Sequence, residues 1–282
     1  MNALLKQVSF VSGLHGSKLT GLTGAINEKN HMKKEHKDAI FANPLDKVAT
    51  FSFDDQVVQV FPDMIKRSVP GYSNMIGMTG VIAKRYWQPG TRIYDLGCSL
   101  GASTLSVCHQ ISDPSLEIVA LDNSQAMIER CQQVFAQEAL TETGEPRHIH
   151  LACADINDSP IENASVVILN FTFQFLPLET RLPLLKRIMA GLAPGGVLVL
   201  SEKVRFDEHE QQDTLFDLHL DFKRANGYSE LEISQKRAAL ENFLQAESFA
   251  THQQRFAEAG FAESCVWFQY LNFASMLAIK AR

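Results

Sequence analysis

Two glycines follow an acid within one short stretch, "IYDLGCSLGASTL", at residues 93–105. Strand-forming residues end at Asp95, and Gly97 and Gly101 come soon after it. Glycine adopts positive φ without strain and lets a backbone approach a ligand closely. The spacing Asp-x-Gly-x-Ser-x-Gly differs from the Gly-x-Gly-x-x-Gly pattern that holds a pyrophosphate. The stretch therefore predicts a strand-to-helix turn beside a ligand, with a tight turn and no ligand as the alternative for these residues alone.

Two further acids end the next two expected strands. "LEIVALD" ends at Asp122, 27 positions after Asp95, and "HIHLACAD" ends at Asp155. An acid at the end of the second strand can accept hydrogen bonds from both hydroxyls of a ribose, and Asp155 can accept from an exocyclic amine. Each acid alone is more often a solvated loop residue or a helix cap. Together the three strand ends predict a nucleoside pocket without a phosphate clamp, which suits S-adenosylmethionine.

Segments with strand character alternate with segments of helix character through most of the chain. The alternation predicts an α/β fold with a doubly wound, mostly parallel sheet covered by helices on both faces. Ligands of such sheets bind beyond the carboxyl ends of the strands, where the acids above are expected. At the C-terminus, "AESCVWFQY" and "FASMLAIKA" predict an antiparallel hairpin. The other expected strands cover residues 92–96, 116–122, 148–155, 164–171 and 197–202.

The alternation is preceded by an extension and interrupted by an insert. Residues 207–250 are expected to form a helical, charge-rich insert within a single domain at 51–282. Residues 1–50 are expected to be a mobile N-terminal extension without the compact apolar block of a secretory signal. Within it, residues 1–31 are expected to lie upstream of the natural start, because the sequence from Met32 onward is typical of a beginning.

Composition excludes several classes of function. The chain has 282 residues, 45% of them hydrophobic, and a formal net charge of −6. This charge argues against a protein that grips nucleic acid through its phosphates. The five cysteines are widely spaced without a Cys-x-x-Cys, so neither a disulfide framework nor a metal site is indicated, and scattered thiols suit a reducing compartment. No stretch reaches the roughly 18 uninterrupted apolar residues of a membrane span.

Several stretches resemble known proteins. "YDLGCSLG", "ALDNS", "CADI" and "LAPGGVLVLSE" resemble the class I methyltransferase fold, Rossmann-like with a seven-stranded sheet, over about residues 70–282. From about Phe51 onward the chain is similar to one family, the carboxy-S-adenosyl-L-methionine synthases. The stretches that carry this similarity are "FPDMIKRSVPGYSNM", "YDLGCSLGASTLS", "LDNSQAMIERC", "ASVVILNFT", "WFQYLNFASM" and, most specific of all, "FKRANGYSELEISQKR".

This resemblance implies an unusual carboxylation. The family uses S-adenosyl-L-methionine as a substrate and prephenate as the carboxyl source, and yields carboxy-S-adenosyl-L-methionine and phenylpyruvate. A separate enzyme then uses the product to carboxymethylate the wobble uridine of tRNA. The resemblance also implies a homodimer. From the composition and charge described above, the protein is expected to be cytoplasmic, without metal, membrane association or direct contact with nucleic acid.

The resemblance also assigns residues to roles. Arg237 is expected to pair with the new carboxylate and to act in catalysis, since a guanidinium binds a carboxylate bidentately and stays charged. Lys203, Lys223 and Arg224 are candidates for holding the prephenate dianion. The expected contacts with S-adenosylmethionine are Tyr72, Gly97, Cys98 and Ser99 beside its aminoacyl or ribose part, Asp122 and Asn123 at the ribose, Asp155 and Ile156 at the adenine, and Asn170 near the sulfonium.

Two other functions share these motifs. A conventional small-molecule methyltransferase would have the same pocket, and only residues 221–237 separate it from a synthase. A non-catalytic module that senses S-adenosylmethionine would bind it without turnover. Taken without the resemblance, Arg237 is an exposed arginine on a charged helix face, and Asn170 needs either a ligand or a local network for its amide. Whether Arg237 serves its own pocket or a partner chain's stays open.

Overall fold

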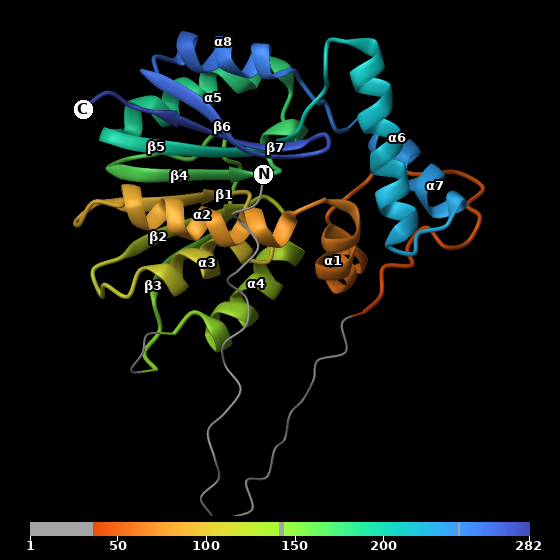
Figure 1. Cartoon of the computed structure of the whole chain (residues 1–282). Helices are drawn as coiled ribbons and strands as arrows, with labels where there is room; N and C mark the ends of the chain where they lie inside the picture. Colours follow the sequence, from red (N-terminus) through yellow and green to blue (C-terminus); the bar gives the residue numbers. More distant parts are fainter. Residues whose placement is uncertain (1–35, 141–143, 242) are drawn as a thin grey trace, which may run out of the picture. The chain divides into compact units, whose positions relative to one another are not determined.

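The computed structural model describes residues 36–140, 144–241 and 243–282. Within these ranges the chain forms one sheet of seven strands in the order β3-β2-β1-β4-β5-β7-β6 (Figure 1). β3 to β5 in this order pair in parallel, and β7 runs antiparallel to both β5 and β6. This confirms the predicted α/β class and its terminal hairpin. The strands are β1 Arg92–Leu96, β2 Glu117–Asp122, β3 His148–Cys153, β4 Ala164–Asn170, β5 Leu192–Lys203, β6 Glu263–Tyr270 and β7 Phe273–Ile279.

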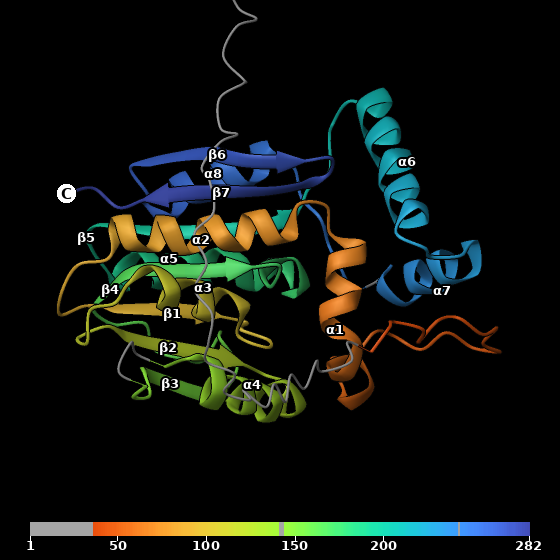
Figure 2. The ribbon, with the colours of Figure 1, turned by 60° about the horizontal axis from the view of Figure 1, so that its bottom comes forward.

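Helices cover both faces of the sheet (Figure 2). Val166 and Ile168 of β4 pack with α2 and α3, whereas Val167 and Leu169 pack with α5 and α8. Because both faces are buried, β4 is a continuous apolar run rather than an alternating one. α4 packs against β2 and β3. The helices of this part are α2 Tyr72–Tyr86, α3 Ala102–Gln110, α4 Gln125–Glu138, α5 Leu178–Gly191 and α8 Phe249–Ala259.

β5 differs most in extent from its prediction, and the bounds of the other strands lie within two residues of theirs. The sequence predicts a strand at 197–202, but β5 begins at Leu192. The reason is that Leu192 already pairs with Ala164 of β4, after which the register shifts. Residues 193–196, with the sequence "APGG", form this irregular start of the strand. β1, in contrast, has the predicted bounds.

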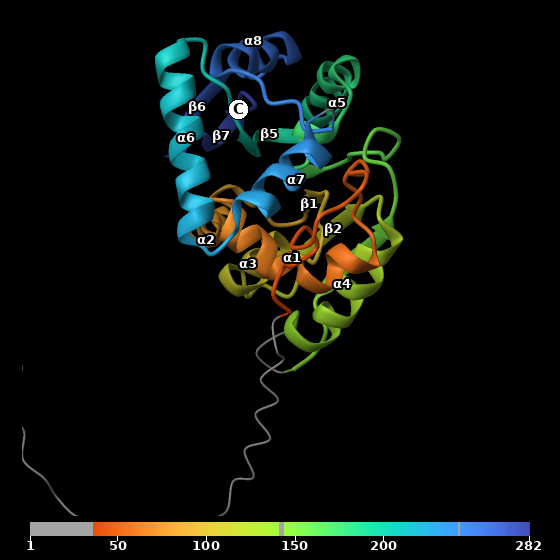
Figure 3. The same cartoon turned by 90° about the vertical axis from the view of Figure 1, so that its right-hand side faces the viewer.

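Three helices lie beyond the carboxyl ends of the parallel strands (Figures 2 and 3). They are α1 Asp55–Ser68, α6 His209–Ala225 and α7 Glu230–Leu240, the last two from the predicted insert. α7 begins with a capping box, in which Ser229 Oγ accepts from Glu232 N (3.3 Å) and the Glu232 carboxylate accepts from Ser229 N (2.7 Å). Asp54 caps α1 by accepting from the first-turn amides. These capping residues set where α1 and α7 begin, and both helices line the site.

The described part of the expected N-terminal extension, residues 36–50, packs against the insert. The Gln235 side chain of α7 donates to the carbonyls of Phe41 (3.0 Å) and Asn43 (2.9 Å) and accepts from Leu45 N (2.8 Å). Asp38 is buried. The prediction about the start of the chain concerns residues 1–31, which lie outside the described ranges. Among the described helices, none has the length and apolar character needed to cross a membrane.

Candidate active site

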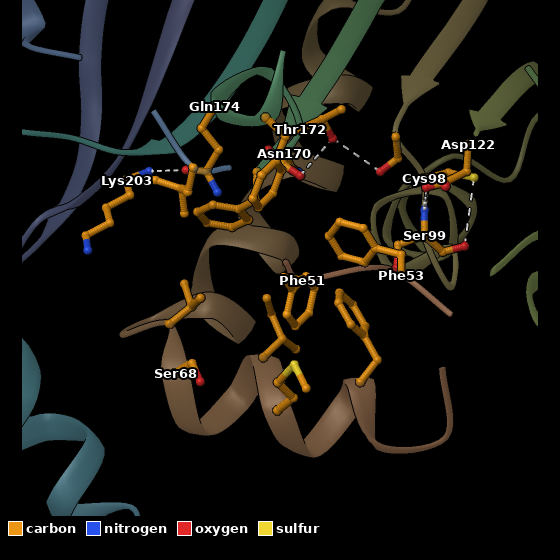
Figure 4. A pocket seen from close by; sticks show the side chains of 18 of the residues that line it. Phe51, Phe53, Ser68, Cys98, Ser99, Asp122, Asn170, Thr172, Gln174 and Lys203 are labelled. Carbon is orange, nitrogen blue, oxygen red and sulfur yellow. Dashed lines mark hydrogen bonds between the residues drawn. The ribbon is translucent and has the colours of Figure 1, made fainter. Parts of the chain in front are cut away.

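A cavity of about 730 Å³ lies at the carboxyl ends of β1, β2 and β4 (Figure 4). α1, α6 and α7 supply part of its remaining wall. Its volume is in the range of small-molecule sites. All the residues expected to contact S-adenosylmethionine, Arg237 excepted, line this one cavity: Tyr72, Gly97, Cys98, Ser99, Asp122, Asn123, Asp155, Ile156 and Asn170.

The turn after β1 is held from both sides. The amides of Gly97 and Cys98 both donate to the carbonyl of Leu121 in β2, at 2.7 and 2.9 Å. Gly97 has φ +81°, and a Cβ there would lie 2.1 Å from Thr172 Oγ1. This glycine is therefore required by the close approach of Thr172 as well as by its own backbone conformation. The turn reaches the cavity because β2 and the end of β4 hold it there.

Asp95 stabilises the turn but does not line the cavity. Its carboxylate is buried and accepts from Thr104 N (3.1 Å) and Thr104 Oγ1 (2.7 Å). Burial raises the pKa of Asp95 to about 6. The first acid of the motif thus ties β1 to α3 and leaves ligand contacts to the residues that follow it.

Asp122 directs its carboxylate to the same turn. One oxygen accepts from Ser99 N and the other from Ser124 N, each at 2.9 Å. Burial raises the pKa of Asp122, and these backbone hydrogen bonds oppose the rise. Each oxygen keeps a lone pair for a further donor. The Asp122 carboxylate can therefore accept hydrogen bonds from the two hydroxyls of a ribose.

Asp155 and Ile156 form a neighbouring part of the wall. Asp155 is exposed, and its carboxylate accepts from Asn157 N at 2.8 Å. Ile156 is buried. An acceptor beside an apolar side chain suits the amine and the ring of adenine.

Asn170 is satisfied by its own neighbours. Its amide nitrogen donates to Ser103 Oγ at 2.9 Å, and its amide oxygen accepts from Ser201 Oγ at 2.5 Å. Of the two alternatives that the sequence left for this amide, the structure shows the local network. Tyr72 lies nearby, with its ring centroid 6.0 Å from that of Phe171, and burial raises the pKa of Tyr72.

Arg237 lies apart from the expected cofactor residues. It is exposed on α7, it is not among the residues that line the cavity, and its guanidinium carbon lies 5.0 Å from the ring centroid of Phe216. Arg224 also stays outside. It is exposed and pairs with Glu230 (2.5 Å) and Asp221 (2.7 Å). Two of the three candidates for the dianion, Lys203 and Lys223, do line the cavity.

The side of the cavity that faces the insert is positively charged. Figure 4 shows Lys203 and Gln174 across the view from Asp122 and Ser99. Lys223 and His219 of α6 and Lys236 of α7 line the cavity with Lys203. Burial, together with the charges of Lys203 and Lys236, lowers the pKa of Lys223 to about 7.

Solved structures similar to this chain share its fold. Human N-acetylserotonin methyltransferase in complex with SAM has a TM-score of 0.54 at 17% identity, covering 88% of this chain and 64% of that one. A protein of Methanococcus maripaludis, described as a putative S-adenosyl-L-methionine-dependent methyltransferase, has a TM-score of 0.54 at 19% identity. The match covers 85% of this chain and 98% of that one. Residues 93–196 match a family described as a methyltransferase domain. These comparisons confirm the class I methyltransferase fold.

Curated relatives decide the family. The carboxy-S-adenosyl-L-methionine synthase of Citrifermentans bemidjiense is 55% identical over 243 residues, which cover 86% of this chain and 98% of that protein. The synthase of Vibrio cholerae is 54% identical over 244 residues, covering 86% and 97%. The chain belongs to the carboxy-S-adenosyl-L-methionine synthase family. This confirms the resemblance found in the sequence, and with it that the chain is an enzyme of the S-adenosylmethionine-using type.

Sequence reasoning missed parts of the synthase cavity. Lys236 directly precedes Arg237 in "SQKR". The sequence could have indicated Lys236, because it lies in the stretch that resembles the family most specifically. Phe53 and Phe175 meet edge to face at 5.6 Å between ring centroids, and Phe175 stacks on Phe243 at 4.8 Å. Phe51 and Phe53 alternate in "FSFDD", which predicts a shared face. These rings give the synthase cavity an aromatic wall.

Proposed function

We propose that this synthase converts S-adenosyl-L-methionine and prephenate to carboxy-S-adenosyl-L-methionine and phenylpyruvate. The observation that carries the proposal is a single cavity with two different ends. At one end, Asp122 offers hydrogen-bond acceptors and Gly97 lets the backbone approach a ligand closely, as a nucleoside requires. The other end carries Lys203, Lys223 and Lys236, as an anionic carboxyl donor requires.

The reaction balances without an external base. Prephenate loses carbon dioxide and hydroxide as its ring becomes aromatic, which leaves phenylpyruvate. The hydroxide takes a proton from the S-methyl group, whose protons the sulfonium makes acidic, and becomes water. The resulting ylide carbon attacks carbon dioxide, and the new C–C bond completes the carboxymethyl group. The cavity residues therefore have to align the two substrates and to retain carbon dioxide until the ylide attacks it.

The aromatic wall supports the exclusion of water that this sequence of steps needs. Carbon dioxide and a ylide are both lost when water enters a site. Phe53 packs against Phe51 at 5.2 Å and against Phe175 at 5.6 Å, measured between ring centroids. Phe243 extends this wall from the loop after α7. We assign these rings the role of keeping the reacting atoms dry.

Arg237 has its proposed role at the new carboxylate. Its guanidinium carbon lies 5.0 Å and Lys203 Nζ lies 5.9 Å from the ring centroid of Phe216, so Arg237 lies near the cationic end. Its exposed position on α7 suits a residue that completes a pocket from outside. The proposal includes a homodimer, in which Arg237 serves its own cavity or the partner chain's.

The product has a proposed use in tRNA modification. Carboxy-S-adenosyl-L-methionine would be the donor with which a separate enzyme carboxymethylates wobble uridine. The net charge of −6 supports a synthase that does not itself grip tRNA. Free thiols at Cys98, Cys108 and Cys131 support the cytoplasm as its compartment.

Mass spectrometry tests the proposal. Purified protein is incubated with S-adenosylmethionine and with prephenate labelled with ¹³C in the carboxyl group that is lost. We expect carboxy-S-adenosyl-L-methionine with one ¹³C, together with phenylpyruvate, and neither without prephenate. S-adenosylmethionine that binds and stays unmodified would contradict the proposal and favour a conventional methyltransferase or a binding module.

A further inference from the structure

Two lysines of the cavity have no countercharge. Among the described residues, neither Lys203 nor Lys223 forms an ion pair or donates a side-chain hydrogen bond, although both side chains are partly buried. Lys203 Nζ lies 5.9 Å from the ring centroid of Phe216. An ammonium group removed from water without a carboxylate is unfavourable, and burial accordingly lowers the pKa of both lysines. An anionic ligand in the cavity would supply the missing countercharge.

The third lysine differs because the chain itself compensates it. Lys236 Nζ lies 3.5 Å from the Asp38 carboxylate and 3.1 Å from Ser68 Oγ. Asp38 also accepts from the Tyr228 hydroxyl. Lys236 is therefore an internal partner of residues 36–50, and Lys203 and Lys223 remain for a ligand.

His219 does not change this balance. Burial and the charges of three nearby lysines lower the pKa of His219 to about 3, so the ring is neutral. Its Nε2–H donates to the carbonyl of Ser68 at 2.9 Å. The ring therefore adds neither a positive charge nor a countercharge to the cluster.

We propose that Lys203 and Lys223 form a subsite that selects a dicarboxylate dianion over the corresponding monocarboxylate. This rests on the proposed function, in which the carboxyl donor enters with two carboxylates. Two unpaired cations match two negative charges, and a monoanion would leave one lysine buried without a partner. The subsite would therefore hold the departing monocarboxylate product less tightly than the donor, so the loss of one carboxylate would also release the product.

Two ring compounds that differ by one carboxylate test this subsite. Benzylmalonate has two carboxylates, and 3-phenylpropanoate is the same molecule after loss of one of them. Binding of each is measured by calorimetry on the full chain saturated with S-adenosylmethionine. We expect benzylmalonate to bind about 10- to 100-fold more tightly, which is the usual worth of a hydrogen-bonded charge.

Variants locate the preference. Lys203→Gln and Lys223→Gln should each bring the ratio of the two affinities close to one, and Lys223→Arg should keep it. Arg224→Gln is the matched control, because Arg224 is the next residue of α6 and its charge is paired outside the cavity with Glu230 and Asp221. The affinity for S-adenosylmethionine should stay the same in all four variants.

The outcomes are separable. A ratio near one in the unaltered chain, or a ratio that the glutamine variants leave unchanged, overturns the subsite. So does a loss of S-adenosylmethionine affinity in those variants, since the lysines would then hold its own carboxylate. A third outcome is that benzylmalonate binds more tightly than 3-phenylpropanoate, that the glutamine variants lose this preference, and that prephenate still yields no carboxylated product. In that case the proposed function fails and the dicarboxylate subsite stands.

Discussion

Replacing Gly97 with alanine separates the two demands made on this glycine. Gly97 has φ +81°, and a Cβ there would lie 2.1 Å from Oγ1, 2.4 Å from Cγ2 and 2.7 Å from Cβ of Thr172. Gly90 has φ +80° with no atom within 4 Å of an added Cβ. Gly90→Ala therefore measures the backbone conformation alone, whereas Gly97→Ala adds the collision.

The magnitudes follow from these distances. A left-handed conformation costs a non-glycine residue about 1–2 kcal/mol, and overpacking typically costs a further 1–3 kcal/mol. We expect Gly90→Ala to lower the free energy of unfolding by about 1–2 kcal/mol and Gly97→Ala by about 2–5 kcal/mol. Because Thr172 Cβ is itself too close, trimming Thr172 to alanine in the Gly97→Ala chain should restore only part of the loss.

Thermal unfolding followed by circular dichroism, with S-adenosylmethionine binding in parallel, measures both effects. The two alanine variants should differ in Tm by about 2–10 °C. Gly97→Ala should also weaken S-adenosylmethionine binding, since the turn must move, and Gly90→Ala should not. Equal losses of stability in the two variants would refute the reasoning that Thr172 holds the turn in place.

Three further predictions concern single side chains. Asp122→Asn should weaken S-adenosylmethionine binding about tenfold, measured by calorimetry, because an amide offers one acceptor oxygen where the carboxylate offers two; unchanged affinity would remove Asp122 from the ribose. Arg237→Ala should weaken binding of carboxy-S-adenosyl-L-methionine about 10- to 100-fold and leave S-adenosylmethionine binding nearly unchanged, and equal effects on both ligands would contradict its proposed role. Burial raises the pKa of Glu202 to about 8, and the nearby His252, 3.5 Å away, has its pKa lowered by burial to about 4. The protonated Glu202 therefore contributes stability that is fully present below pH 4.5 and is lost as the pH rises toward 8. Glu202→Gln should stabilise the chain at pH 8 more than at pH 5 in urea unfolding, and the same effect at both values would show that Glu202 is not buried as an acid.

The parts of the site that the sequence predicted are those that strand topology fixes. Asp122 and Asp155 follow consecutive parallel strands, and the carboxyl ends of such strands meet at one edge. β2 is largely apolar and β3 begins by alternating polar and apolar residues, so each strand can be recognised from its own sequence. The same holds for Asn170, although its partners, Ser103 and Ser201, come from other elements and could not be read from its own strand.

The insert is different because its helices are charged on more than one face. Lys223 and Arg224 are neighbours on α6, and nothing in their types says which one faces the cavity. Residues one position apart point about 100° apart around a helix, so packing alone separates Lys223 at the cavity from Arg224 outside it. Asp38 was beyond local reasoning as well, since its partner Lys236 is 198 positions away.

The division of charge within the cavity favours two anchored substrates over one substrate and a neutral acceptor. A methyltransferase that serves a neutral acceptor gains nothing from two unpaired ammonium groups in its pocket, and it bears their desolvation throughout the cycle. Lys203 and Lys223 are tolerable when the working state contains their countercharge. The chain compensates Lys236 with Asp38 but leaves those two uncompensated. The selective compensation is physical support for a dianionic co-substrate that does not depend on the relatives.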